Sequence, residues 1–189
     1  MSNTENTSMK GYGMMTQVIL FRGKMGTGKT TLSNAVGTQL HIPVIHKDDL
    51  YDSIADHITD HFIRNKICFD ILFRLLESTL ACKATIIIDF GYNHLDDVLK
   101  LKSWIEQREG ILTSISCICS DESVWAHRLN ERKTNPQPNQ LITDLHELKQ
   151  HYSTINTDLL EDELQLDCIE DIRVLTEKAI HYISEKKGK

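Results

Sequence analysis

The stretch Gly23-Lys24-Met25-Gly26-Thr27-Gly28-Lys29-Thr30 decides the fold class of this 189-residue chain. It matches the pattern G-x-x-x-x-G-K-[ST] at every specified position. Its glycines let the backbone wrap with the N–H groups turned inward, and the ammonium of Lys29 can then reach the terminal phosphates of a nucleotide. The hydroxyl of Thr30 is placed where Mg²⁺ can use it. We expect the nucleotide to be bound by Gly23, Lys24, Met25, Gly26, Thr27, Gly28, Lys29, Thr30 and Thr31.

The segments on either side of this loop have the expected periodicities. Residues 16–21 form a short apolar run, which is typical of a strand buried on both faces. Residues 29–40 carry Leu32, Val36 and Leu40 at intervals of four, which indicates one apolar face of a helix. The loop therefore connects a predicted strand to a predicted helix, as a phosphate-binding loop requires.

The rest of the chain alternates in the same way. Further strands are expected at 42–45, 84–90 and 111–119, with a fifth at 164–168. Helical patterns cover 49–81, which is long enough for two or three helices, 95–108, the segment after 121, and two pieces of 141–189. This alternation predicts a three-layer α/β/α sandwich with a mostly parallel five-stranded sheet. We expect a flexible tail at 1–13 and a single domain at 14–189.

Composition narrows the choice of partners and compartment. Twenty-one Lys and Arg against twenty-seven Asp and Glu give a net charge of -6, which argues against nucleic acid or an acidic membrane as a general partner. Apolar runs are far shorter than the roughly 20 residues of a membrane helix. The five cysteines are an odd number without a CxxC pair, and free thiols suit a reducing compartment. We expect a cytoplasmic protein that is a monomer or a homodimer.

Two carboxylates follow the second predicted strand. Asp48 and Asp49 lie where the carboxyl end of a parallel strand places ligand-binding groups. One of them can accept the proton of an acceptor hydroxyl during phosphoryl transfer. Either residue can instead cap the helix that starts near Leu50. Residue order alone does not decide which of the two is the base.

Asp89 ends the third predicted strand after three isoleucines. A lone carboxylate there is costly unless it meets a cation or hydrogen-bond donors. Asp89 can support Mg²⁺ through water, together with Thr30, or hold the acceptor. The alternative is a structural bond to Thr30 or to the N–H groups of the loop.

Arg128 and Arg132 are four residues apart and therefore share one face of a predicted helix. Arginines above the phosphates stabilise the charge of phosphoryl transfer. We expect a lid at about 121–140, with the segment Asn135-Pro136-Gln137-Pro138-Asn139 as its hinge, because closure keeps water out. The alternative is surface pairing with Glu131 or Asp121.

The chain resembles the small P-loop kinases of the AAA_33 type in four segments that occur in the same order. These are the loop, Lys47-Asp48-Asp49-Leu50, Ile86-Ile87-Ile88-Asp89 and Arg128-Leu129-Asn130-Glu131-Arg132. That group includes polynucleotide 5'-kinase domains and chloramphenicol phosphotransferase-like and gluconate or shikimate kinase-like proteins. The resemblance implies a fold like that of nucleoside monophosphate kinases, with Asp48 as the general base and Arg128 and Arg132 on the lid helix. Polynucleotide kinases carry an arginine three residues after the base, where this chain has Tyr51.

These observations predict an ATP- and Mg²⁺-dependent phosphotransferase that acts on an uncharged hydroxyl compound such as an antibiotic, a sugar or a nucleoside. The alternatives are a nucleotide-binding regulator or slow ATPase, and a kinase of nucleic-acid 5'-hydroxyl ends. His57 and His61 are expected on one helical face, either as a polar surface or as part of a metal site. The catalytic candidates are Lys29, Asp48, Arg128 and Arg132, and the metal candidates are Thr30 and Asp89.

Overall fold

The computed structural model describes residues 16–134 and 137–187, so the tail expected at 1–13 lies outside the described part. The strands are β1 (Thr16–Arg22), β2 (Val44–His46), β3 (Thr85–Asp89), β4 (Gly110–Ile118) and β5 (Leu164–Asp167). The helices are α1 (Lys29–Leu40), α2 (Lys47–Ser53), α3 (His61–Ala81), α4 (Leu95–Glu106), α5 (Glu122–Glu131), η1 (Arg132–Thr134), α6 (Leu145–Tyr152) and α7 (Ile172–Lys187).

The sheet confirms the predicted fold class. Its strand order is β2-β3-β1-β4-β5, and every neighbouring pair is parallel. The expectation of a mostly parallel sheet is therefore met by a fully parallel one. The register pairs Phe21 of β1 with Asp89 of β3 and pairs His46 of β2 with the same Asp89. The carboxyl ends of these three strands consequently meet at one edge of the sheet.

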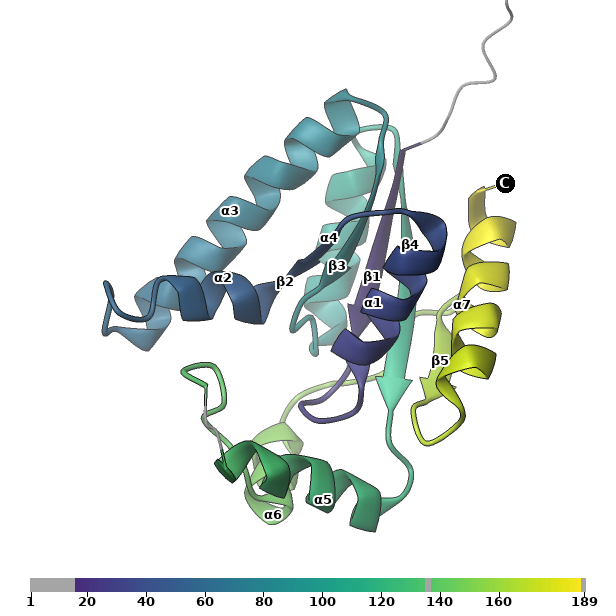
Figure 1. Cartoon of the computed structure of the whole chain (residues 1–189). Helices are drawn as coiled ribbons and strands as arrows, with labels where there is room; N and C mark the ends of the chain where they lie inside the picture. Colours follow the sequence, from purple (N-terminus) through teal and green to yellow (C-terminus); the bar gives the residue numbers. More distant parts are fainter. Residues whose placement is uncertain (1–15, 135–136, 188–189) are drawn as a thin grey trace, which may run out of the picture.

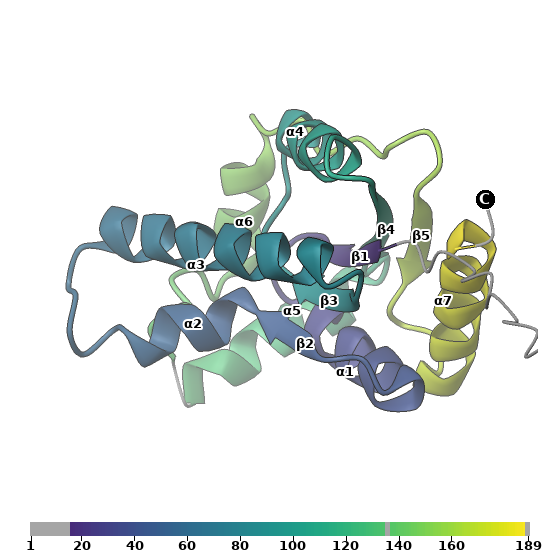
Figure 2. The ribbon, with the colours of Figure 1, turned by 90° about the horizontal axis from the view of Figure 1, so that it is seen from above.

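Helices cover both faces of the sheet (Figure 1; Figure 2). Val18 and Leu20 of β1 pack with side chains of α3 and α4, whereas Ile19 and Phe21 pack with side chains of α1 and α7. All four are completely buried. Successive side chains of a strand point to opposite faces, so a strand between two helical layers must be apolar throughout.

The long helical pattern at 49–81 forms two helices, α2 and α3, joined by a turn at 54–60. The turn ends at Asp60, whose carboxylate accepts a hydrogen bond of 3.0 Å from the backbone N–H of Ile63 and so caps α3. His57 lies in the turn and His61 is the first residue of α3. The expectation that these two histidines share a helical face is therefore wrong, because the N-cap at Asp60 starts a new helix between them.

A third apolar cluster lies beyond the carboxyl ends of the strands. It joins Cys119 to Trp125 and Leu129 of α5 and to Leu148 and Tyr152 of α6. Figure 1 shows α5 and α6 across this end of the sheet. The predicted lid at 121–140 thus contains α5 and η1, and residues 135–136 of its expected hinge lie outside the described part.

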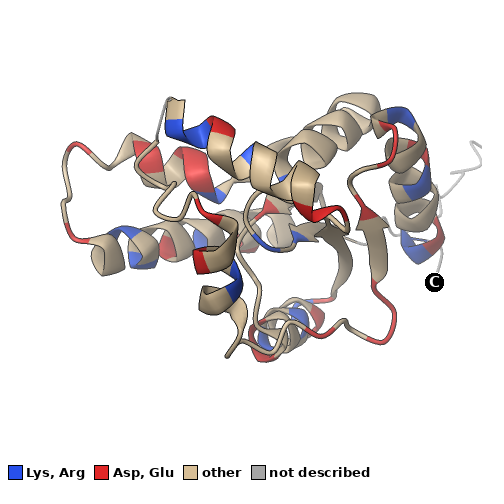
Figure 3. Ribbon diagram, turned by 90° about the horizontal axis from the view of Figure 1, so that it is seen from below, with Lys and Arg blue, Asp and Glu red and all other residues tan. Residues whose placement is uncertain are grey.

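Basic and acidic residues are intermixed on the helices seen from this end of the molecule (Figure 3). Within residues 16–134 and 137–187, none of the helices combines the length and the apolar composition that crossing a membrane requires. All five cysteines are free thiols.

Candidate active site

The loop after β1 is built on glycines that no other residue could replace without strain. Gly23 has a φ of 140°, and a Cβ atom there would lie 2.2 Å from the carbonyl oxygen of Cys117 on β4. Both the backbone conformation and the close approach require glycine. The loop therefore begins, directly after β1, at a point where its backbone is in close contact with the neighbouring strand β4.

The loop then presents hydrogen-bond donors to the cleft. Helix α1 begins at Lys29, and Gly28 before it provides no side-chain cap, so the first N–H groups of the helix are available to an anion. The ammonium of Lys29 donates to the carbonyl oxygen of Lys24 at 3.0 Å, and the hydroxyl of Thr27 donates to the same oxygen at 2.9 Å. These bonds hold the loop closed around the end of the Lys29 side chain.

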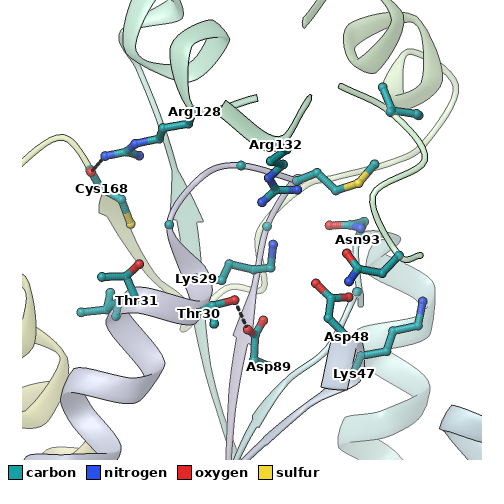
Figure 4. Close-up of a pocket in the computed structure, with 18 of the residues that line it drawn as sticks. Lys29, Thr30, Thr31, Lys47, Asp48, Asp89, Asn93, Arg128, Arg132 and Cys168 are labelled. Carbon is teal, nitrogen blue, oxygen red and sulfur yellow. Dashed lines mark hydrogen bonds between the residues drawn. The ribbon is translucent and has the colours of Figure 1, made fainter. Parts of the chain in front are cut away.

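Thr30 and Asp89 are joined directly, as one of the alternatives from the sequence predicted. The Thr30 hydroxyl donates to Oδ2 of Asp89 at 2.7 Å (Figure 4). Nδ1 of His46 lies 3.0 Å from the same oxygen, and Nε2 of His46 lies 2.9 Å from Oδ1 of Asn34. The sequence did not identify His46 as a partner of Asp89. Its position at the end of β2, one strand away, is the signal that could have suggested it.

The protonation of this buried group follows from its partners. Burial alone would raise the pKa of Asp89, but the hydrogen bonds from His46 and Thr30 and the charge of Lys29 outweigh it and hold the pKa below the ordinary value. The hydrogen bond to Asp89 in turn raises the pKa of His46. Asp89 is therefore an anion with a fixed orientation at the bottom of the cleft.

Asp48 faces the loop across the same cleft, which has a volume of about 620 Å³. Figure 4 shows its carboxylate between Lys47 and Asn93 on one side and Lys29 on the other. Partial loss of hydration inside the cleft raises the pKa of Asp48, and the charge of Asp89 adds to this effect, while Lys29 and Lys47 oppose it. A carboxylate whose pKa is raised in a cleft is suited to accept a proton.

The two arginines of the predicted lid make different contacts. Arg128 donates through Nη2 to the carbonyl oxygen of Cys168 at 2.7 Å and through Nη1 to the carbonyl oxygen of Thr27 at 3.3 Å. Arg132 instead extends into the cleft above Lys29 (Figure 4). In the surface pairing considered as an alternative, Glu131 and Asp121 would be the partners, but Glu131 lies 3.5 Å from His127 and Asp121 caps α5.

Most of the predicted site residues line the cleft. Those lining it are Gly23, Met25, Gly26, Gly28, Lys29, Thr30, Thr31, Asp48, Asp89, Arg128 and Arg132. The other two members of the predicted set, Lys24 and Thr27, lie in the loop but do not line the cleft, and Lys24 instead places its ammonium 5.5 Å from the centre of the Tyr152 ring. The sequence missed Asn93 and Tyr152, which come from a loop and from α6 and carry no motif.

The donor set near the loop fits a hard cation that keeps most of its water. Within residues 16–134 and 137–187, no cluster of three or more His, Cys, Asp or Glu side chains could hold a metal ion. Thr30 and Asp89 supply two oxygen groups beside the loop. Mg²⁺ is commonly held in this way, by one or two protein oxygens, by waters and by the phosphates of the substrate.

Comparison with known proteins agrees with the fold. The profile of the AAA_33 family, described as an AAA domain, matches residues 18–155. No curated protein matches the chain. A candidate kinase from Chloroflexus aurantiacus J-10-fl superposes with a TM-score of 0.72 at 18% identity over 89% of this chain and 98% of that one. A sugar kinase from Janibacter sp. HTCC2649 gives 0.62 at 19% identity, covering 89% and 95%. A gluconokinase from Sinorhizobium meliloti 1021 gives 0.60 at 17% identity, covering 92% and 93%.

Proposed function

Because the chain belongs to the AAA_33 family, we propose that it is an ATP-dependent phosphotransferase that moves the γ-phosphoryl group to a hydroxyl of a small molecule. The observation that carries the proposal is the position of Asp48, which lies in one cleft with Lys29, Thr30 and Arg132. A nucleotide-binding loop alone would need no carboxylate opposite it. The sugar kinase and the gluconokinase that share this fold support an acceptor of small size.

On the nucleotide side, the loop amides and the free N-terminus of α1 bind the phosphates, and Lys29 places its charge beside them. Thr30 and, through water, Asp89 would hold Mg²⁺, which supplies positive charge to the phosphate oxygens. His46 keeps Asp89 ionised and oriented. Arg132 reaches over this site and stabilises the charge that spreads over the transferred group.

On the acceptor side, Asp48 accepts the hydroxyl proton as the acceptor oxygen bonds to the γ-phosphorus. The bond between that phosphorus and the bridging oxygen breaks, and ADP leaves with the electron pair. Arg128 holds α5 against the loop through Thr27 and against the segment after β5 through Cys168. Closure of the predicted lid over this arrangement would keep water from competing with the acceptor.

The test compares two adjacent carboxylates. The purified protein is supplied with ATP and Mg²⁺ and a panel of hydroxyl compounds, and both ADP and the phosphorylated product are measured. Asp48→Asn is expected to lower kcat at least 100-fold while nucleotide affinity is kept, because the amide cannot take the proton. Asp49→Asn is the matched control, since Asp49 does not line the cleft, and it should retain near wild-type activity.

Two outcomes would contradict the proposal. One is the absence of any phosphorylated product across sugars, nucleosides and aromatic alcohols. The other is a product whose rate of formation is unchanged by Asp48→Asn. ADP release without an acceptor, undiminished in that variant, would instead identify an ATPase.

A further inference from the structure

Tyr51 lies beside the candidate base. It follows Asp48 by three residues on α2, so the two side chains occupy the same face of the helix, about 5–6 Å apart at their Cβ atoms. Tyr51 is only 2% exposed, yet it lines the cleft. Its hydroxyl oxygen lies 2.5 Å from Nδ1 of His61, the first residue of α3.

The neighbours of His61 assign its tautomer. The side-chain nitrogen of Asn65 lies 3.1 Å from the backbone carbonyl oxygen of His61, and a carbonyl oxygen can only accept a hydrogen bond. The atom facing it is therefore the amide nitrogen and not the amide oxygen. The same nitrogen lies 2.9 Å from Nε2 of His61, so Nε2 must accept and carries no proton. In the neutral ring the proton is then on Nδ1, which donates to the oxygen of Tyr51.

This assignment leaves the phenolic hydrogen of Tyr51 free. Among the described residues, His61 is the only one that forms a hydrogen bond with the Tyr51 hydroxyl. The ring is held in place by the Arg64 guanidinium, 4.6 Å from its centre, and by the Lys47 ammonium at 5.9 Å. Tyr51 is therefore an oriented donor on the acceptor side of the cleft.

Asn93 provides the complementary group. Its side-chain nitrogen donates to the hydroxyl of Tyr152 at 3.2 Å, which leaves its oxygen Oδ1 buried without a partner among the described residues. Figure 4 shows the Asn93 side chain beside Asp48. An unpaired buried carbonyl costs free energy, and a hydroxyl group of a bound molecule would satisfy it.

We propose that Tyr51 determines acceptor specificity by donating a hydrogen bond to a hydroxyl oxygen adjacent to the reacting hydroxyl, while Asn93 accepts a hydrogen bond from a hydroxyl of the same molecule. The acceptor is then a polyol with at least two neighbouring hydroxyls. Asp48 and Asn93 are acceptors and Tyr51 is a neutral donor, a combination that hydroxyl groups satisfy because each can both donate and accept. The inference rests on the proposed phosphotransfer for its substrate class. It rests on the tautomer of His61 for the claim that the Tyr51 hydroxyl donates its hydrogen to the acceptor.

The first test reads the tautomer without any catalysis. Protein labelled with ¹⁵N-histidine is studied by long-range ¹H–¹⁵N correlation, and His61→Gln identifies the His61 signals by their loss. We expect a neutral ring with a proton on Nδ1 and a bare Nε2. A proton on Nε2 would mean that Tyr51 donates to His61, and that result would overturn the role of Tyr51 whatever the enzyme phosphorylates.

The second test measures selectivity. For a polyol acceptor found in the panel, kcat/KM is compared with that of the analogue lacking the neighbouring hydroxyl. The wild type should prefer the polyol by about tenfold or more, and Tyr51→Phe should reduce this preference to near unity, since one hydrogen bond is lost. Tyr182→Phe removes a hydroxyl that donates to the carbonyl oxygen of Asp162. Tyr182 does not line the cleft, so this variant is the matched control.

The outcomes separate the two proposals. An unchanged preference in Tyr51→Phe, or equal use of monohydroxy alcohols by the wild type, overturns the specificity role while phosphotransfer stands. Failure to phosphorylate any compound overturns the proposed function and the acceptor assignment together, and the NMR result for His61 is then still decided on its own.

Discussion

At the scale of single residues, Asp48 and Asp49 show how position decides chemistry. They are neighbours with the same side chain. The order of residues left open which of them is the base, and only the family resemblance pointed to Asp48. The phase of α2 turns Asp48 into the cleft and leaves Asp49 outside its lining. The direction in which each side chain of α2 points depends on the residue at which the helix begins and on how the helix packs against the sheet. The order of residues does not specify either.

The raised pKa of Asp48 predicts the pH dependence of the reaction. The residue must be ionised to accept a proton, so kcat/KM should fall on the acid side with an apparent pKa above the ordinary aspartate value of about 3.9. Initial rates at a saturating nucleotide concentration between pH 4 and 8 measure it. The acid limb of the profile is this decrease of kcat/KM at low pH. An apparent pKa of the acid limb at or below the ordinary value would contradict the assignment of Asp48.

Lys47 should affect the same decrease of kcat/KM at acid pH. Its positive charge lowers the pKa of Asp48, so Lys47→Met should move the acid limb to higher pH. Lys66→Met, on an exposed part of α3, is the control and should leave the limb in place. A shift of equal size in both variants would show a general effect of net charge.

At the scale of elements, the predictions were most accurate where local pattern and tertiary role agree. Helix α1 was predicted with both of its bounds, because the loop glycines and the apolar face mark it. The length of the pattern at 49–81 predicted two or three helices, but it did not locate the break at 54–60, since that turn contains neither Gly nor Pro. The contact between α5 and the loop, in which the Trp125 indole N–H donates to the carbonyl oxygen of Met25 at 2.7 Å, left no local signal.

This contact makes Trp125 a reporter of the nucleotide site. Addition of ADP with Mg²⁺ should change the tryptophan emission of the wild type and of Trp104→Phe, in which Trp125 is the remaining tryptophan. Trp125→Phe should lose the emission change and bind ADP about fivefold more weakly in calorimetry, because one hydrogen bond to the loop is missing. If the emission change is instead lost in Trp104→Phe and kept in Trp125→Phe, the response comes from Trp104 on α4 and the prediction is wrong.

At the scale of the whole molecule, a buried ion pair ties distant parts of the chain together. Arg22, the last residue of β1, contacts both carboxylate oxygens of Glu163 at 2.6 Å, and the two side chains are 3% and 0% exposed. Ser114 of β4 and the backbone N–H of Leu160 complete the bonds of this carboxylate. The segment before β5 is thereby fixed to the strand that enters the phosphate-binding loop.

Glu163→Ala should lower the free energy of unfolding by about 3–5 kcal/mol, because Arg22 would be left charged and unpaired in the interior. Urea unfolding followed by circular dichroism measures it. Glu106→Ala removes one partner of an exposed pair with Lys102 and should change stability by at most about 0.5 kcal/mol. A similar small effect at Glu163 would show that water reaches Arg22.

The sequence by itself determined the phosphate-binding loop, the alternation of strands and helices, and the parallel sheet, because each of these depends on local spacing and on apolar periodicity. Only the tertiary structure decided the strand order, the pairing of His46 with Asp89, the choice of Asp48 over Asp49 as the residue facing the loop, and the chain from Asn65 through His61 to Tyr51 with Asn93 nearby. These features depend on which side chains meet at the carboxyl edge of the sheet. That meeting is set by the packing of whole layers, in which residues far apart in the sequence become neighbours.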